Sequence, residues 1–327
     1  MESDGGMPRV LVLGSTGQIG SALVPALRDR YGKYNVVAGY HSRKPEAPEL
    51  LDGPVEQVDV LDKGSLEKVI ERYNVDTIYH LAAILSAAGE RNPMLAWRVN
   101  MDGLINVLEA AREHGIKVFW PSSIAAFGPS APKYNTPQYT VMDPTTMYGI
   151  TKYAGELLGR YYFLKYGVDV RGVRYPGIIS SEALPGGGTT DYAVEIFYYA
   201  LEGKKYKCYL RKDTMLPMMY MPDAVKAAIQ LMEADRSRLK LMVGYNVAAF
   251  SFTPEQLANE IRKYIPSFEV EYEPDFRQAI ADSWPKSLDD SVAREEWGWR
   301  PDWGFEAMVK DMLVKLSRKL GKHLDLE

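Results

Sequence analysis

The chain has 327 residues, of which 46% are hydrophobic and 25% charged, so it can bury a core in one large domain or two modest ones. Its net charge of −4 and the lack of a long basic run argue against nucleic acid or an anionic membrane as the main partner. Cys208 is the only cysteine, which excludes an intrachain disulfide, and four scattered histidines form no zinc-ligand pattern. We therefore expect no bound metal.

The segment that precedes Met7 carries no targeting pattern. Residues 1–6, MESDGG, are acidic and lack the profile of a secretory or transit peptide, so we interpret them as a tag or a leader remnant. No apolar run is long enough to span a bilayer. We expect a cytoplasmic protein, or a mitochondrial matrix protein if a leader was removed.

Apolar strands alternate with amphipathic helices along the first half of the chain. Strands are predicted at residues 9–13, 35–39, 55–60, 75–83, 117–123 and 168–175. Helices are predicted at residues 17–30, 63–73, 92–114 and 146–166. This alternation predicts an α/β fold, a doubly wound parallel-sheet Rossmann domain with helices on both faces.

After Tyr175 the alternation breaks down. The remainder mixes short strands and Pro or Gly turns with helices that are predicted near residues 191–203, 222–234, 253–264 and 304–319. We predict a nucleotide-binding domain of residues 7–175 and a smaller, irregular α/β substrate-binding lobe of residues 176–327. Part of that lobe is expected to return to the Rossmann sheet.

A glycine-rich turn follows the first strand. Gly14, Gly17 and Gly20 stand in a G-x-x-G-x-x-G pattern that runs into the first helix through Gln18 and Ile19. Glycines allow the tight turn and let the backbone approach a pyrophosphate, which the free N–H groups at the helix N-terminus attract. The alternative is a glycine-rich turn without a ligand, but its place in the first βα turn favours dinucleotide binding.

The end of the second strand lacks the acid that commonly holds the adenosine ribose. It reads Tyr40-His41-Ser42-Arg43, where Arg43 either accepts a 2′-phosphate or is a solvated loop charge. Asp59 and Val60, at the end of the third strand, are the natural contacts for adenine.

A tyrosine precedes a lysine by four residues at three places: Tyr40–Lys44, Tyr148–Lys152 and Tyr161–Lys165. The second pair starts the helix predicted at 146–166, where residues four apart share a face. The third pair lies more than three turns further along this helix, too far from a cofactor to act. Tyr40 is expected beside the adenosine, which leaves Tyr148 and Lys152 as the candidate catalytic pair.

Several motifs together resemble a known family. The Tyr148–Lys152 pair, the upstream Ser122 and Ser123 and the glycine turn resemble the short-chain dehydrogenase/reductase superfamily. HLAA (80–83), Asn100 and DDSVAREEWGWRP (289–301) are similar to its extended, epimerase-like branch. The resemblance spans Met7 to about Leu320.

That resemblance implies NAD as the cofactor, with Lys152 on the nicotinamide ribose, Ser123 on the substrate oxygen and Asn100 as structural support. The residues that it places at the cofactor are Gly14, Gly17, Gln18, Ile19, Gly20, Tyr40, His41, Asp59, Val60, Leu81, Ala82, Ala83, Asn100, Ser122, Tyr148, Lys152, Tyr175, Pro176 and Ile178.

The chemistry follows from the residue types. A free tyrosine has a pKa of about 10, so it is a poor base at neutral pH. The Lys152 ammonium and a positively charged nicotinamide favour the phenolate, and a pKa lower by about 3 units needs roughly 4 kcal/mol. Tyr148 then takes the hydroxyl proton of the substrate while hydride leaves the same carbon for the nicotinamide.

Three segments, LSAAGERNP, RYPGIIS and GGGTTDYAVEIF, resemble the L-threonine 3-dehydrogenases of the extended short-chain type, which oxidise the β-hydroxyl of threonine to 2-amino-3-ketobutyrate with NAD. The residues that this resemblance places around the substrate are Ser86, Ser123, Tyr148, Thr189, Thr190 and Trp284. Hydroxyl side chains suit a small zwitterion, because they both donate and accept. Alternatively, Gly186–Gly188 is a mere turn, Thr189 a helix N-cap and Trp284 a packed aromatic.

Two rival functions remain. A nucleotide-sugar epimerase or reductase needs basic residues for a diphosphate, and Lys204, Lys205, Lys207 and Arg211 are available in the second lobe. A catalytically silent NAD(P)-sensing protein has no need for Tyr148, Lys152 and Ser123 in register. By resemblance, we also expect a homodimer through the helices at 92–114 and 146–166.

Overall fold

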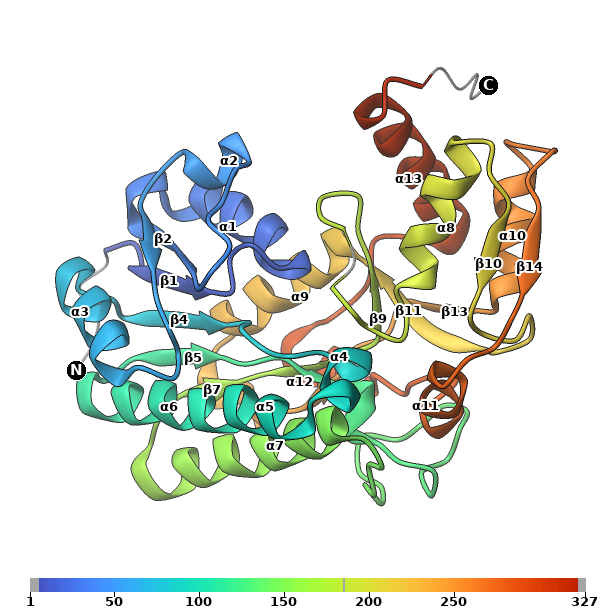
Figure 1. Ribbon diagram of the computed structural model, residues 1–327. Helices are drawn as coiled ribbons and strands as arrows, with labels where there is room; N and C mark the ends of the chain where they lie inside the picture. The colour runs from blue at the N-terminus through green and yellow to red at the C-terminus, as the bar shows by residue number, and fades with distance from the viewer. Residues whose placement is uncertain (1–5, 185, 323–327) are drawn as a thin grey trace.

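A six-stranded parallel sheet forms the centre of the first half of the molecule (Figure 1). The computed structural model describes residues 6–184 and 186–322, so residues 1–5 of the predicted remnant lie outside it. The strands, in order across the sheet, are β3 (Val55–Gln57), β2 (Val36–Tyr40), β1 (Val10–Leu13), β4 (Thr77–His80), β5 (Lys117–Phe119) and β7 (Val170–Arg171). All neighbours pair in parallel, which confirms the predicted α/β Rossmann fold.

Helices cover both faces of this sheet, as the crossovers between parallel strands require (Figure 1). On one face α1 (Gln18–Tyr31) packs against α2 (Pro48–Leu51) and α9 (Met221–Glu233). On the other face α6 (Gly103–His114) packs between α3 (Lys63–Tyr73) and α7 (Met147–Tyr166). Because α9 comes from the second half of the chain, that half returns to the first sheet.

Two predicted strands, at 117–123 and 168–175, are each broken in two. After β5 and β7, the chain continues into β6 (Ser122–Ser123) and β8 (Val173–Tyr175). These two strands pair with each other in a separate parallel sheet, and β12 (Tyr245–Asn246) pairs with the other side of β8. The break falls at Gly172, whose N–H bonds the Met242 carbonyl at 3.1 Å while its own carbonyl accepts from Gly244 at 2.9 Å. The prediction of single strands was therefore wrong. The alternating sequence pattern continues through this position and gives no sign of the break.

The helix predicted at 92–114 contains an irregular turn. It runs as α5 (Pro93–Trp97), a π-helical turn at Arg98–Asp102 and then α6, and a short helix that was not predicted, α4 (Ser86–Arg91), precedes it. The wide turn holds the buried Asn100, whose side chain bonds the backbone of Ile84. Such turns are often found at functional sites.

The second half of the chain adds two small sheets, ordered β13-β11-β9 and β10-β14. Its strands are β9 (Gly177–Ile179), β10 (Tyr206–Cys208), β11 (Leu216–Tyr220), β13 (Phe250–Phe252) and β14 (Val270–Tyr272). Its remaining helices are α8 (Tyr192–Leu201), α10 (Pro254–Arg262), α11 (Arg277–Ser283), α12 (Ser291–Trp297) and α13 (Phe305–Lys319). Among the described residues, no helix combines the length and the apolar character that crossing a membrane requires.

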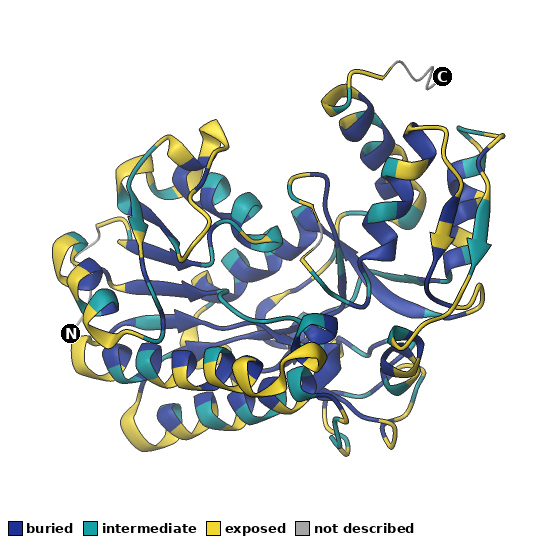
Figure 2. Cartoon of the chain, in the orientation of Figure 1, coloured by how far each residue is buried: buried dark blue, intermediate teal, exposed yellow. Residues whose placement is uncertain are grey.

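Two hydrophobic clusters divide the interior, and Figure 2 shows the buried segments in both halves. The first surrounds the six-stranded sheet and includes side chains of α9 and β12 as well as Trp297 and Trp299. The second joins α8, β11, α10 and α13, and also takes in Ile124 and Phe127 from the first half. We therefore propose a boundary between the two domains near Tyr175. Segments from each half of the chain contribute to the hydrophobic cluster of the other half.

Helix α7, which carries the candidate catalytic pair, lies unusually close to the sheet. The Thr146 hydroxyl caps its N-terminus by accepting from Gly149 N–H at 3.0 Å. At Gly155 an added Cβ would lie 2.3 Å from the Trp120 ring, so only glycine lets the indole contact the helix backbone. This contact sets the distance between α7 and the strand end at Ser122–Ser123.

We predict that Gly155→Ala destabilises the protein by about 1–3 kcal/mol, because the added methyl group overpacks against Trp120. Elsewhere in a helix the same change stabilises by about 1 kcal/mol. Gly89→Ala in α4 is the matched control, since a Cβ there meets its nearest atom at 3.5 Å. Urea unfolding of both variants measures the effect, and equal stability of the two would contradict the packing argument.

Candidate active site

The glycine turn is built for close approach of a ligand to the backbone. Gly14 follows β1 with a φ of 85°, in the left-handed region, and a Cβ there would lie 2.9 Å from Ala82 N. A Cβ at Gly20 would lie 2.2 Å from the Gly14 carbonyl oxygen. The N–H groups of Gly14 and Ser15 donate to the Gly39 carbonyl at 3.1 and 3.0 Å, which fixes the turn to β2.

Helix α1 begins directly after this turn, with Gly17 as its N-cap. Within the described residues no side chain caps it, so the N–H groups of Gln18, Ile19 and Gly20 remain available for an anion. Gln18 Nε2 donates to the Ile178 carbonyl at 3.3 Å, which ties the turn to β9. A glycine cradle with an uncapped helix N-terminus fits the pyrophosphate of a dinucleotide.

The predicted adenosine contacts lie at the ends of β2 and β3. His41 Nε2 stands 3.7 Å from Asp59 Oδ2, and both side chains are exposed, while Tyr40 is half-buried. Val60 is buried, and its carbonyl accepts from Asn106 Nδ2 at 2.9 Å. Of these four side chains, those of His41 and Asp59 are therefore open to an adenine base.

The segment Leu81–Ala83 continues from β4 beside the glycine turn, and Leu81 N–H donates to the Leu13 carbonyl at 2.9 Å. Asn100 supports it from behind. Its Oδ1 accepts from Ile84 N–H at 2.8 Å, and its Nδ2 donates to the Ile84 carbonyl and to Thr151 Oγ1, both at 3.1 Å. Asn100 thus joins the end of this segment to α7.

The three predicted catalytic residues lie together. Lys152 is buried, donates to the Pro121 carbonyl at 2.6 Å and lies 4.6 Å from the Trp120 ring centroid. Its Nζ is 5.4 Å from the ring centroid of Tyr148, and the Ser123 hydroxyl lies near enough to that phenol to lower its pKa.

The other two tyrosine–lysine pairs lie outside this cluster. Tyr161 is 49% exposed and its ring packs against Tyr162 and Tyr166. Lys44 is exposed in the loop after β2. Of the three pairs, only Tyr148 and Lys152 belong to the cluster that contains Ser123.

The electrostatics of the pair depend on burial. Burial raises the pKa of Tyr148 to about 12, and the Ser123 hydroxyl opposes this. Burial also lowers the pKa of Lys152 to about 7, and the Glu156 carboxylate opposes that. The protein groups alone therefore do not produce the expected low pKa of Tyr148.

Sequence reasoning missed a buried ionic network behind Lys152. Glu156 accepts from Arg174 at 2.8 Å on each carboxylate oxygen and from the Ser122 hydroxyl at 2.5 Å. The hydroxyl of Ser122, which we placed at the cofactor, therefore points to this carboxylate. The sequence could have indicated the place of Glu156, since this residue follows Lys152 by four positions and so shares its helix face.

Two of the predicted substrate residues, Ser86 at the start of α4 and Thr189, are in contact with each other. Ser86 and Thr189 are buried, with their hydroxyl oxygens 3.0 Å apart, and Ser86 Oγ also accepts from Thr189 N–H at 3.1 Å. Thr190 is half-buried against Gly177 of β9. Trp284 is buried in the second hydrophobic cluster, against which Tyr148 also packs.

Three further predicted cofactor residues connect the two halves. Tyr175 is buried and its hydroxyl donates to the Ala224 carbonyl of α9 at 2.6 Å, so its polar atom serves the fold. Pro176 is buried between β8 and β9, and Ile178 is half-buried. The Ile178 carbonyl, which Gln18 bonds, lies nearest to the glycine turn among their polar atoms.

Asp191 was not predicted as a functional residue, although it follows the two threonines. Its buried carboxylate accepts from the N–H groups of Gly187 and Gly188 at 2.9 and 2.7 Å. The glycine segment is thus fastened on one side, and the Gly187 carbonyl accepts from Ala88 of α4 at 3.3 Å on the other. Burial raises the pKa of Asp191 to about 6, and the two N–H groups oppose the rise.

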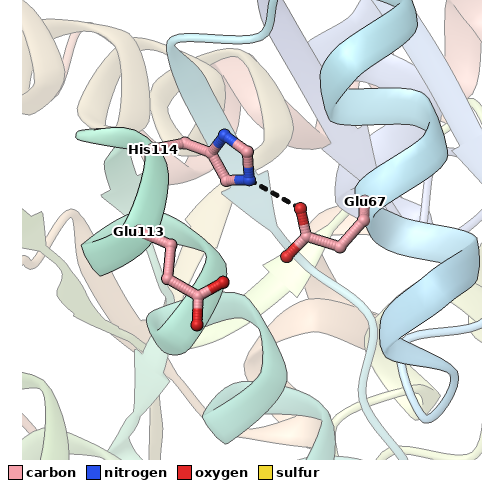
Figure 3. A group of neighbouring side chains, drawn as sticks. All are labelled: Glu67, Glu113 and His114. Carbon is pink, nitrogen blue, oxygen red and sulfur yellow. Dashed lines mark hydrogen bonds and ion pairs between the residues drawn. The ribbon is translucent and has the colours of Figure 1, made fainter.

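One group with metal-ligand residue types occurs among the described residues, at the opposite edge of the sheet (Figure 3). It consists of the half-buried Glu67 in the middle of α3 and of the exposed Glu113 and His114 at the C-terminal end of α6. His114 Nε2 lies 2.6 Å from Glu67 Oε2, and Lys63 bonds Glu113 at 3.0 Å. These are surface ion pairs, and the group plays no part in the site.

The fold and the glycine cradle define a dinucleotide-binding α/β protein with a tyrosine, a lysine and a serine at the carboxyl edge of its sheet. The model of the NAD dependent epimerase/dehydratase family matches residues 10–248, and the chain belongs to this family of NAD-dependent enzymes.

Similar proteins cover nearly the whole chain. An uncharacterized epimerase/dehydratase of Staphylococcus haemolyticus is 49% identical over 314 residues, 96% of this chain and 99% of that protein. A solved structure named GalE-like L-threonine dehydrogenase from Cupriavidus necator, holo form, is 53% identical with a TM-score of 0.92, covering 94% and 100% of the two chains. Another, named monomeric L-threonine 3-dehydrogenase from a metagenome, is 44% identical with a TM-score of 0.92, covering 95% and 99%.

We predict that Asp191→Asn stabilises the protein at pH 7.5 but not at pH 4. The folded-state pKa of about 6 lies above the usual value near 3.9, so protonated Asp191 stabilises the fold below about pH 4. That stability is lost as the pH rises through about 6, by at most about 3 kcal/mol. Urea unfolding at both pH values checks this, with the exposed Asp213→Asn as a control. If the free energies of unfolding of wild type and Asp191→Asn differed by the same amount at both pH values, the prediction would be contradicted.

Proposed function

We propose that the chain is an L-threonine 3-dehydrogenase that oxidises the β-hydroxyl of L-threonine to 2-amino-3-ketobutyrate with NAD. The observation that carries this proposal is the likeness, along nearly the whole chain, to solved structures that bear that name. The cluster of Tyr148, Lys152 and Ser123 beside the glycine turn supplies the residue types that the reaction needs.

Tyr148 is the proposed general base. Its phenolate accepts the proton of the substrate hydroxyl, while Ser123 donates a hydrogen bond to the same oxygen as it becomes a carbonyl. Lys152 holds a positive charge beside the phenolate, and the Pro121 carbonyl fixes its position. When bound, NAD supplies the hydride acceptor and a further positive charge, which opposes the rise that burial imposes on the pKa of Tyr148.

The second lobe favours a small substrate over a nucleotide sugar. Its four basic side chains near 204–211 each pair with an acid: Lys204 with Glu202 at 2.6 Å, Lys205 with Glu271 at 2.9 Å, Lys207 with Glu273 at 2.8 Å and Arg211 with Asp282 at 2.8 Å. Paired surface cations are poor ligands for a diphosphate. The hydroxyls of Ser86, Thr189 and Thr190 instead suit the carboxylate and ammonium of an amino acid.

NAD rather than NADP is the proposed coenzyme, on the strength of the family. Arg43 is exposed in the loop after β2, where it is a possible contact for a 2′-phosphate. The cytoplasmic or mitochondrial location stays a prediction.

We predict that purified protein reduces NAD with L-threonine, and that Tyr148→Phe lowers kcat by roughly 1,000-fold, because the hydroxyl proton then has no base. NADH affinity, measured by fluorescence, should stay within a factor of about three of wild type. Tyr161→Phe is the matched control, a tyrosine on the same helix that also precedes a lysine by four residues, and it should retain activity. No activity with threonine but turnover of a UDP-sugar would overturn the proposed function.

We also propose a homodimer through α5, α6 and α7. The large apolar side chains that are exposed on these helices include Trp97, Ile105, Ile150, Leu157, Tyr161 and Leu164. The last four recur at intervals of seven, four and three residues, so they form one stripe along α7. Exposed apolar stripes of this kind mark helix–helix contacts between subunits, whereas one similar structure is named monomeric.

Light scattering should give about twice the mass of the chain, and the double variant Leu157→Glu/Leu164→Glu should be monomeric, because two charges then lie in the apolar stripe. Leu51→Glu, an exposed leucine on α2, is the control and should leave the mass unchanged. A monomeric wild-type protein would contradict the proposal.

A further inference from the structure

The pair of Glu156 and Arg174 is a buried ion pair next to the site. The two side chains are 7% and 6% exposed, and both carboxylate oxygens accept from the guanidinium at 2.8 Å. Arg174 also donates to the Gln138 carbonyl at 2.9 Å and to Asn246 Oδ1 at 3.2 Å. Burying an ion pair brings little stability compared with well-packed apolar residues, so its place in the molecule calls for another reason.

The pair is attached to the site at two points. Glu156 lies one helical turn after Lys152 on the same face of α7, and it accepts from the Ser122 hydroxyl at 2.5 Å. Ser122 and Ser123 form β6, which pairs with β8 so that Ser122 lies opposite Arg174. One carboxylate therefore contacts the strand that carries Ser123 and stands beside the lysine that serves Tyr148.

Few other ionisable groups face Lys152. Tyr148 lies on α7 itself, and His80 at the end of β4 stays neutral, because burial and then the Lys152 charge lower its pKa to about 3. Glu90 of α4 accepts from Met147 N–H at the start of α7, and Glu109 of α6 bonds Tyr162, more than two turns away from Lys152. Glu156 is thus the carboxylate placed to hold the lysine charge.

We propose that Glu156 and Arg174 are positioning residues, which set the protonation of Lys152 through the balance of their opposite charges and hold the serine strand in register with Tyr148. This proposal rests on the proposed function only in giving Lys152 a role in catalysis. Its central test does not depend on turnover.

The two charges have opposite effects on the lysine. Without the Glu156 charge, the Arg174 cation is left alone and disfavours a second cation nearby, so Lys152 loses its proton more easily. Without the Arg174 charge, the lone carboxylate favours the ammonium, so Lys152 holds its proton more firmly. A network that only stabilises the fold has no reason to give shifts of opposite sign.

The test follows the titration of Lys152 by NMR in the full-length protein labelled with [6-¹³C]lysine, and the signal is assigned by its loss in Lys152→Arg. We expect the midpoint to fall by about one pH unit in Glu156→Gln and to rise by about one in Arg174→Gln, a tenfold change in each proton-binding constant. Lys133, whose pKa burial also lowers, is the internal control and should not move. Shifts of the same sign, or none, would overturn the proposal.

Two further variants keep the charges balanced, and they test the proposal even if Glu156→Gln or Arg174→Gln fails to fold. Arg174→Lys retains both charges, and the double variant Glu156→Gln/Arg174→Gln removes both. Each should leave the Lys152 midpoint within about 0.3 units of wild type, and a shift of one unit in either would overturn the charge argument.

Kinetics give a second readout that a structural role alone would not change. In Glu156→Gln the loss of kcat should be largest at high pH, where Lys152 is neutral, and should shrink as the pH falls. A loss of kcat that is equal from pH 6 to pH 9 would overturn the role of this charge in catalysis. The effect of Glu156 and Arg174 on the protonation of Lys152 would then still be tested by the NMR titration alone.

Discussion

The site depends on one enclosed ammonium group. Lys152 lies between the Trp120 ring and the Pro121 carbonyl, in a place where water does not solvate its charge. Because desolvation works against the charged form, the surrounding groups decide whether the lysine carries a proton at neutral pH. The same indole ring packs against Gly155, so the contact that encloses the charge also fixes the position of the helix.

Tyr148 experiences the opposite effect of burial. The enclosure that makes the ammonium easier to deprotonate makes the phenol harder to deprotonate. In the proposed reaction, the charge of the bound coenzyme would therefore have to oppose the effect of burial on Tyr148. Removal of the substrate proton would then depend on the presence of the oxidised coenzyme.

Much of the fold could be predicted from the sequence, because the glycine turn and the strand–helix alternation are local patterns. The pairing of Tyr148 with Lys152 also follows from helix periodicity. The breaks at Gly172 and in the helix at 92–114 could not be predicted, because they depend on contacts with Met242 and Ile84 from other parts of the chain. Likewise, nothing local shows that Arg174 would meet Glu156, since β8 approaches α7 only in the folded protein.

The path of the chain between the two cores has a mechanical consequence. After β9 the chain builds the second core and then returns through α9, which packs against α1 on one face of the first sheet. It continues through β12, which pairs with β8, and leaves again towards α10. A fragment cut at Tyr175 would expose the apolar side of α1 that α9 now covers. We therefore expect the two halves to unfold together, because the second half supplies part of the packing of the first.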